Sequence, residues 1–132
     1  MEEALEPAAR TRTDEAVVIV EVGARDGLQN ESTMIGSAAK VDVSRRIEAD
    51  GSRRIEVASF VHRDRVPQMA DADHVVAELG SSPAGVSHIG LALNRRAMER
   101  ALSSTVDEIN LVVGASEGFN RANDGVSPKS TL

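Results

Sequence analysis

Apolar residues in this chain follow two patterns, which predict buried strands and one-sided helices. The β-branched run Val17–Val20 suits a strand buried on both faces, as in a parallel sheet covered by helices. Gly23 and Gly27 then bracket Ala24-Arg25-Asp26. The sequence therefore predicts a guanidinium and a carboxylate side by side on a turn at the carboxyl end of a buried strand, where α/β folds place their chemistry.

The second pattern is the spacing of about 3.6 residues that is typical of helices. Ser37 is predicted to cap a first helix, and Asp50-Gly51 to end it with Gly51 in the left-handed conformation. A strand is predicted over 54–60, and Asp71 is predicted to cap a second helix that Gly80 ends. The apolar faces of the two helices consist of Ala39, Val43 and Ile47, and of Ala72, Val75, Val76 and Leu79.

Further along, a turn at 83–85 precedes a third strand over 86–93, a helix opened by Asn94 and a fourth strand over 109–113. The apolar face of this last helix consists of Ala97, Met98, Ala101 and Leu102. The alternation βαβαβαβ predicts an α/β fold with parallel strands. Periodicity alone leaves two architectures open, part of a (β/α)8 barrel and a flavodoxin-like doubly wound domain.

Composition limits the size and the partners of the protein. The chain has 132 residues, 41% of them hydrophobic, which suffices for one domain with a core. It is short for a whole (β/α)8 barrel, which needs ~250 residues. Fifteen basic against 21 acidic residues give a net charge of −6, which disfavours a nucleic-acid partner. No apolar run approaches the roughly 20 residues of a membrane span, and the absence of cysteine fits a cytoplasmic location.

Five polar residues gather around the first predicted turn: Glu21, Arg25, Asp26, Gln29 and Asn30. An Arg-Asp pair on a turn is by itself an ordinary solvated pair. The uninterrupted string V-E-V-G-A-R-D-G-L-Q-N-E, however, resembles the signature of the hydroxymethylglutaryl-CoA lyases. The blocks I-E-V-A-S-F-V and V-P-Q-M-A-D, and the segment that begins G-A-S-E after the fourth strand, are similar to the same family. The resemblance runs from about Val17 to Ser127.

The resemblance implies a partial (β/α)8 TIM barrel, about the first four βα units, and a retro-Claisen cleavage of 3-hydroxy-3-methylglutaryl-CoA to acetyl-CoA and acetoacetate in leucine degradation. It implies that Arg25 is catalytic and binds substrate, that Gln29 and Glu56 bind substrate, that Glu21 supports them, and that Asp26 is a ligand of Mg²⁺ or Mn²⁺. The family's other metal ligands lie on later strands, so the cofactor is expected only with a second half. The expected small-molecule partner is an acyl-CoA.

The ends of the chain give two further expectations. Residues 1–15 are acidic and are predicted to form a disordered tail, and 16–132 to form the amino-terminal half of a barrel. Ser127-Pro128 is a good helix start, but only Lys129–Leu132 follow it, which indicates truncation. We therefore expect little lyase activity from the chain alone, and either self-association or a complementing second half.

Several alternatives stay open at this point. Glu21 and Glu56 would also suit simple pairing with arginines inside a barrel wall. Ser59 and Ser116 suit structural roles, and His88 suits packing or hydrogen bonding. For the chain as a whole, the alternatives are a non-catalytic half-barrel that serves as a binding module, or a related carboxyltransferase or Claisen-type synthase.

Overall fold

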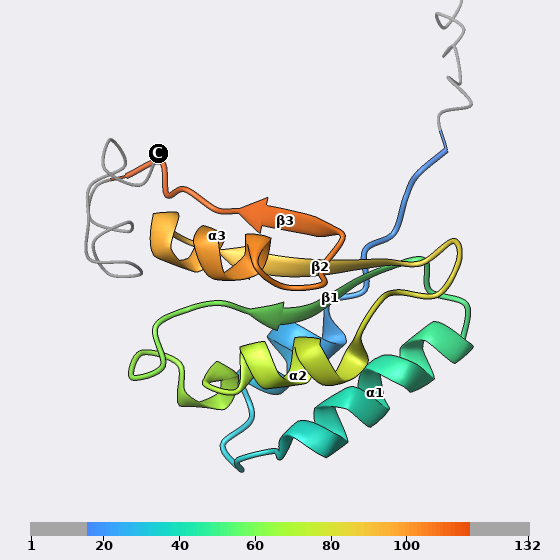
Figure 1. Ribbon diagram of the computed structural model, residues 1–132, viewed down its shortest axis with the longest axis horizontal. Helices are drawn as coiled ribbons and strands as arrows, with labels where there is room; N and C mark the ends of the chain where they lie inside the picture. The colour runs from blue at the N-terminus through green and yellow to red at the C-terminus, as the bar shows by residue number, and fades with distance from the viewer. Residues whose placement is uncertain (1–15, 117–132) are drawn as a thin grey trace, which may run out of the picture.

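A computed structural model describes residues 16–116, which form a three-stranded parallel sheet with helices along it (Figure 1). The sheet has the order β1-β2-β3, with strands β1 (Arg54–Ser59), β2 (Ser87–Ala92) and β3 (Glu108–Leu111). The helices are α1 (Ser37–Ala49), α2 (Ala72–Leu79) and α3 (Arg95–Leu102), and two short turns are η1 (Gly23–Gly27) and η2 (Pro67–Met69). In Figure 1, α1 and α2 lie next to each other beside β1, and α3 lies against β2 and β3.

The order of the strands distinguishes between the two architectures that the sequence left open. Glu21 bridges to Ile55, so the segment before η1 lies beside β1, and each later strand is added next to the one before it. A flavodoxin-like sheet would instead place the first strand between the second and the third. Successive addition in one direction is the order of a (β/α)8 barrel. The predicted fold class, a partial TIM barrel with parallel strands, is therefore confirmed.

The core lies between the sheet and the helices. It consists of Ile55, Val57, Ala58, Phe60, Ala72, Val75, Val76, Leu79, Ala92, Ala97 and Ala101. Phe60 lies across Gly90, where an added Cβ would come within 2.6 Å of the ring atom Cε2. The guanidinium of Arg100 stacks 5.6 Å from the centroid of the same ring. Glycine is therefore the residue that lets Phe60 fill this part of the core.

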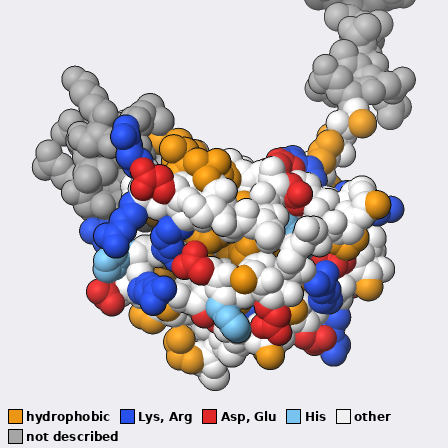
Figure 2. All heavy atoms as spheres, viewed as in Figure 1, with side chains coloured by type: hydrophobic (Ala, Val, Ile, Leu, Met, Phe, Trp, Pro, Cys, Tyr) orange, Lys and Arg blue, Asp and Glu red, His pale blue; other side chains and the backbone are white. Residues whose placement is uncertain are grey.

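The prediction of a first strand over Val17–Val20 is wrong. Val17, Val18 and Ile19 are 88%, 63% and 79% exposed, and only the bridge at Glu21 joins this segment to the sheet. The register explains the difference: with Glu21 opposite Ile55, Val20 falls opposite the first residue of β1, and the residues before Val20 face a turn. They have no strand to pair with there. In Figure 2, this hydrophobic arm stands away from the body of the protein.

The remaining predicted elements are found, with two changes at the first helix. Its N-cap is Gly36, while the Ser37 hydroxyl donates to the carboxylate of Asp71 at 2.7 Å. Its most buried residues are Lys40 and Ser44. Of the predicted apolar stripe, Ala39 is exposed and was wrongly included, whereas Ile47 packs against the core. This face is held both by apolar packing of Val41 and Ile47 against the core and by the polar contacts of Lys40 with Gln68 and Asp71.

The other helix signals are mostly confirmed. The side chain of Asn94 accepts the amide of Ala97 at 2.9 Å, as an N-cap does. Gly51 and Gly80 have φ of 96° and 65° after their helices. Leu102 is 67% exposed, so the predicted face of α3 extends one residue too far. No helix in residues 16–116 is long and apolar enough to cross a membrane. The predicted tail, the helix start at Ser127 and the later part of the G-A-S-E segment lie outside the described residues.

Candidate functional site

The turn η1 presents Arg25 and Asp26 at the carboxyl end of the segment that lies beside β1. Its backbone closes on the carbonyl of Val22, which accepts the amide of Asp26 at 2.8 Å. Oε1 of Glu21 accepts the amide of Gly23 at 2.7 Å, and a Cβ on Gly23 would lie 2.8 Å from that oxygen. Glu21 therefore supports the turn, and Gly23 leaves room for it to do so. Within residues 16–116, the Glu21 carboxylate bonds to this backbone amide and not to an arginine.

Arg25 is held by a buried carboxylate. Its Nε donates to Oε1 of Glu56, whose side chain is 4% exposed, while the Arg25 side chain is 16% exposed. Oε2 of the same Glu56 accepts Nδ2 of Asn110 on β3 at 3.1 Å. The structure thus brings Arg25 and Glu56 together, and the charge of Arg25 balances the desolvated carboxylate.

Asn110 is the residue of this cluster that the sequence analysis did not identify. The signal was present, since an asparagine in the apolar run from Ile109 to Val113 is unfavourable in a strand. Such a residue is retained where its amide has a hydrogen-bond partner. In this protein the partner is Glu56.

Asp26 projects into solvent, with a side chain that is 53% exposed. One of its oxygens is 3.2 Å from Nη1 of Arg25. In the part of the chain that the structure describes, no group of three or more histidine, cysteine or acidic side chains is placed to hold a metal ion. A hard divalent cation needs about six oxygen ligands, so the described residues do not form a metal site by themselves.

Gln29 and Ser59 each carry a buried oxygen that has no hydrogen-bond partner among residues 16–116. Gln29 follows η1, and its Oε1 is the unpaired atom, while Ser59 ends β1 and leaves its Oγ unpaired. An unmade hydrogen bond of this kind costs about 1–3 kcal/mol. Both residues lie at the carboxyl end of a segment that forms the candidate site. Both oxygens could accept a further hydrogen bond. In the described part of the chain, Gln29 forms no hydrogen bond with Arg25 or Glu56.

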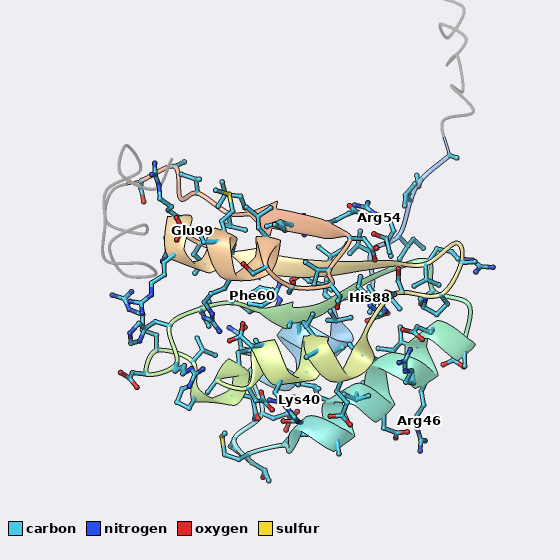
Figure 3. The ribbon with its side chains drawn as sticks, viewed as in Figure 1. Lys40, Arg46, Arg54, Phe60, His88 and Glu99 are labelled. Carbon is cyan, nitrogen blue, oxygen red and sulfur yellow. The ribbon has the colours of Figure 1, made fainter. Side chains whose placement is uncertain are left out.

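Of the three histidines, His88 lies in the interior and the others at the surface. Nε2 of His88 is 2.6 Å from Oε1 of Glu48, and its side chain is 2% exposed. Figure 3 shows it between the sheet and α1. This confirms His88 as a hydrogen-bonding residue of the core. His62 and His74 are exposed, as is Ser116.

A second ionic cluster lies at the opposite, amino end of the strands. Arg54, the first residue of β1, donates from Nε to Oε1 of Glu108 at 3.1 Å and also from Nη2 to Oε2. Hydrogen bonds from Arg54 and from Ser87 hold the pKa of Glu108 below its usual range. This pair fastens β1 to β3 and is separate from the candidate site.

No protein-family model matches the chain. A 3-hydroxy-3-isohexenylglutaryl-CoA/hydroxymethylglutaryl-CoA lyase from Pseudomonas aeruginosa is 43% identical over 116 residues, which are 88% of this chain and 38% of that protein. An (R)-citramalyl-CoA lyase from Chloroflexus aurantiacus is 40% identical over 118 residues, 83% of this chain and 37% of that protein.

Solved structures give the same result. A hydroxymethylglutaryl-CoA lyase from Acinetobacter baumannii, in complex with coenzyme A and 3-methylmalate, has a TM-score of 0.82 and 32% sequence identity over 86% of this chain and 37% of that chain. The chain thus spans just over a third of the length of the relatives that it matches.

The fold and these relatives show the class of protein: the chain is homologous to carbon–carbon lyases built on a TIM barrel. Among these enzymes its relatives include several hydroxymethylglutaryl-CoA lyases, and the match is consistent with their amino-terminal half. The family resemblance that the motifs predicted is therefore confirmed.

Proposed function

We propose that this chain supplies the amino-terminal part of a lyase that cleaves 3-hydroxy-3-methylglutaryl-CoA to acetyl-CoA and acetoacetate. The observation that carries this proposal is the pairing of Arg25 with buried Glu56 beside exposed Asp26. It places a fixed cation at the carboxyl end of the strands, where TIM-barrel enzymes bind their substrates.

The reaction needs such a cation. The C3 hydroxyl of the substrate loses its proton, the C2–C3 bond breaks, and its electron pair forms the enolate of the departing thioester, which then takes up a proton at C2. Arg25 is the group proposed to donate to the developing enolate oxygen, because a fixed positive donor lowers the energy of that charge. Glu56 holds Nε of Arg25, which leaves the outer guanidinium nitrogens for the substrate and for Asp26.

The other predicted site residues have supporting parts in this proposal. The unpaired oxygen of Gln29 is a candidate acceptor for a substrate hydroxyl, and Glu21 keeps η1 closed. Asp26 would be one ligand of Mg²⁺ or Mn²⁺, which would polarise the substrate oxygens when bound. The remaining ligands and the base that takes the hydroxyl proton have to come from outside the described residues.

A second substrate class is favoured by one comparison. The Chloroflexus relative is a citramalyl-CoA lyase at 40% identity, and its named substrate is also a 3-hydroxyacyl-CoA, open to the same cleavage. Acyl-CoA recognition is supported by the coenzyme A in the Acinetobacter structure. The proposal also includes a cytoplasmic location, a place in leucine degradation and the absence of a nucleic-acid partner.

The test is to join this chain to the complementary part of the Pseudomonas lyase and to assay the hybrid with both substrates, with Mg²⁺ and with Mn²⁺. We expect cleavage by the hybrid and little by the chain alone. A folded hybrid that cleaves neither substrate would contradict the proposal and favour a non-catalytic half-barrel. Preference for citramalyl-CoA would favour the second substrate class.

A further inference from the structure

Asn110 is a polar residue in an apolar strand, and its side chain forms a hydrogen bond with Glu56 of the candidate site. It lies opposite Leu91 in the sheet, on the strand beyond β2 as seen from β1. Leu91 offers no polar side-chain partner. The amide nitrogen instead reaches Oε2 of Glu56 across β2, at 3.1 Å.

The Glu56 carboxylate is therefore held at two points. Asn110 donates to one oxygen and Arg25 to the other. The last torsion of a glutamate side chain is broad, so a carboxylate that is bound at one oxygen can still rotate. Two donors from different elements, η1 and β3, fix its plane. The direction in which Oε1 faces Arg25 is fixed with it.

We propose that Asn110 is a positioning residue that sets the orientation of the Arg25 guanidinium through Glu56. Without Asn110, the buried carboxylate keeps its charge and its pairing with Arg25 but loses its fixed plane. The guanidinium then samples several orientations, and its outer nitrogens no longer face one place. The consequence for turnover rests on the proposed function, whereas the consequence for Arg25 does not.

The direct test is exchange of the Arg25 Nε proton with water, measured by nuclear magnetic resonance on the ¹⁵N-labelled full chain. We expect slow exchange in the parent, compared with the exposed Arg46. Asn110→Leu and the smaller Asn110→Ala should accelerate it about tenfold or more, the factor expected from losing one hydrogen bond to a charged group. Asn30→Leu is the matched control, since Asn30 donates at 2.9 Å to the backbone oxygen of Asp26 and not to Glu56.

Equal exchange at Arg25 in the parent and in a folded Asn110 variant would overturn the proposal, with folding judged by amide protection in β2. Equal exchange at Arg25 and Arg46 in the parent would overturn it without any variant. In the active hybrid, Asn110→Leu should lower kcat more than it changes KM. If the parent hybrid fails to cleave substrate, the proposed function fails while the exchange result still decides the role of Asn110.

Discussion

Replacing Lys40 with methionine is expected to destabilise the protein more than any exposed charge replacement on the same helix. Lys40 points from α1 toward α2 (Figure 3), and its side chain is 5% exposed. Its Nζ donates to Oδ1 of Asp71 at 2.6 Å and also to the backbone oxygen of Gln68. Gln68 in turn holds the segment before α1, because its amide bonds to three backbone groups between residues 31 and 35.

The magnitude follows from the charge that the substitution leaves behind. Removing one partner of a buried ion pair costs roughly 3–5 kcal/mol. Asp71 is 28% exposed and keeps its hydrogen bond from Ser37, so we expect the lower end, about 3 kcal/mol. Burial acts to raise the pKa of Asp71, but hydrogen bonds from Lys40 and Ser37 outweigh it and hold the pKa below its usual range. Asp71→Asn should cost at least as much, because it leaves the more deeply buried ammonium without its carboxylate.

Urea unfolding at neutral pH, followed by circular dichroism, measures these differences. Arg46→Met is the matched control on α1, since Arg46 and Asp42 form a 2.8 Å pair with side chains 78% and 60% exposed. Such a pair is worth about 0.3–0.5 kcal/mol. If Lys40→Met costs no more than Arg46→Met, the argument that a buried ion pair holds α1 to α2 is refuted.

Three further predictions concern the core, the ionic cluster and the sheet edge. Gly90→Ala should cost about 1–3 kcal/mol, because the new Cβ collides with Phe60; a melting temperature equal to that of Gly27→Ala, where a Cβ meets nothing within 4 Å, would contradict this. Because the pKa of folded Glu108 is lowered, its stabilisation is complete above the unfolded pKa of about 4.3 and is lost as the pH falls through the folded value. The stability difference between parent and Glu108→Gln should therefore be present at neutral pH and vanish in acid, and a constant difference would disprove it. Light scattering should show self-association through β3, because this strand pairs only with β2 in the described sheet. Figure 2 shows exposed hydrophobic side chains over it. A monomer at high concentration would contradict this prediction.

Local signals in the sequence were sufficient to predict α2 and the order of the helices and strands. The apolar residues of α2 recur at helical spacing, all four are buried, and Gly80 ends the helix with a positive φ. Each boundary there depends on neighbouring residues alone, as caps and helical periodicity do. The family motifs then identified the barrel, which the strand order supports.

Long-range partners explain what the sequence did not predict. Val17–Val20 has the composition of a buried strand, but the register leaves the residues before Val20 opposite a turn. Lys40 is buried because Asp71 and Gln68, about thirty residues away, satisfy its ammonium. The contact between Asn110 and Glu56 joins residues 54 positions apart. A pattern of apolar spacing carries no information about such pairs.

The role of Arg25 is tested most directly by the rate of 3-hydroxy-3-methylglutaryl-CoA cleavage in the completed barrel, compared between the parent hybrid and its Arg25→Met variant. Losing one fixed donor to a developing oxyanion typically costs on the order of 10²–10³ in rate. We therefore expect kcat to fall by that factor while metal binding persists, whereas Asp26→Asn should weaken metal binding. Turnover of Arg25→Met close to that of the parent hybrid would contradict the assignment of Arg25 as the catalytic cation.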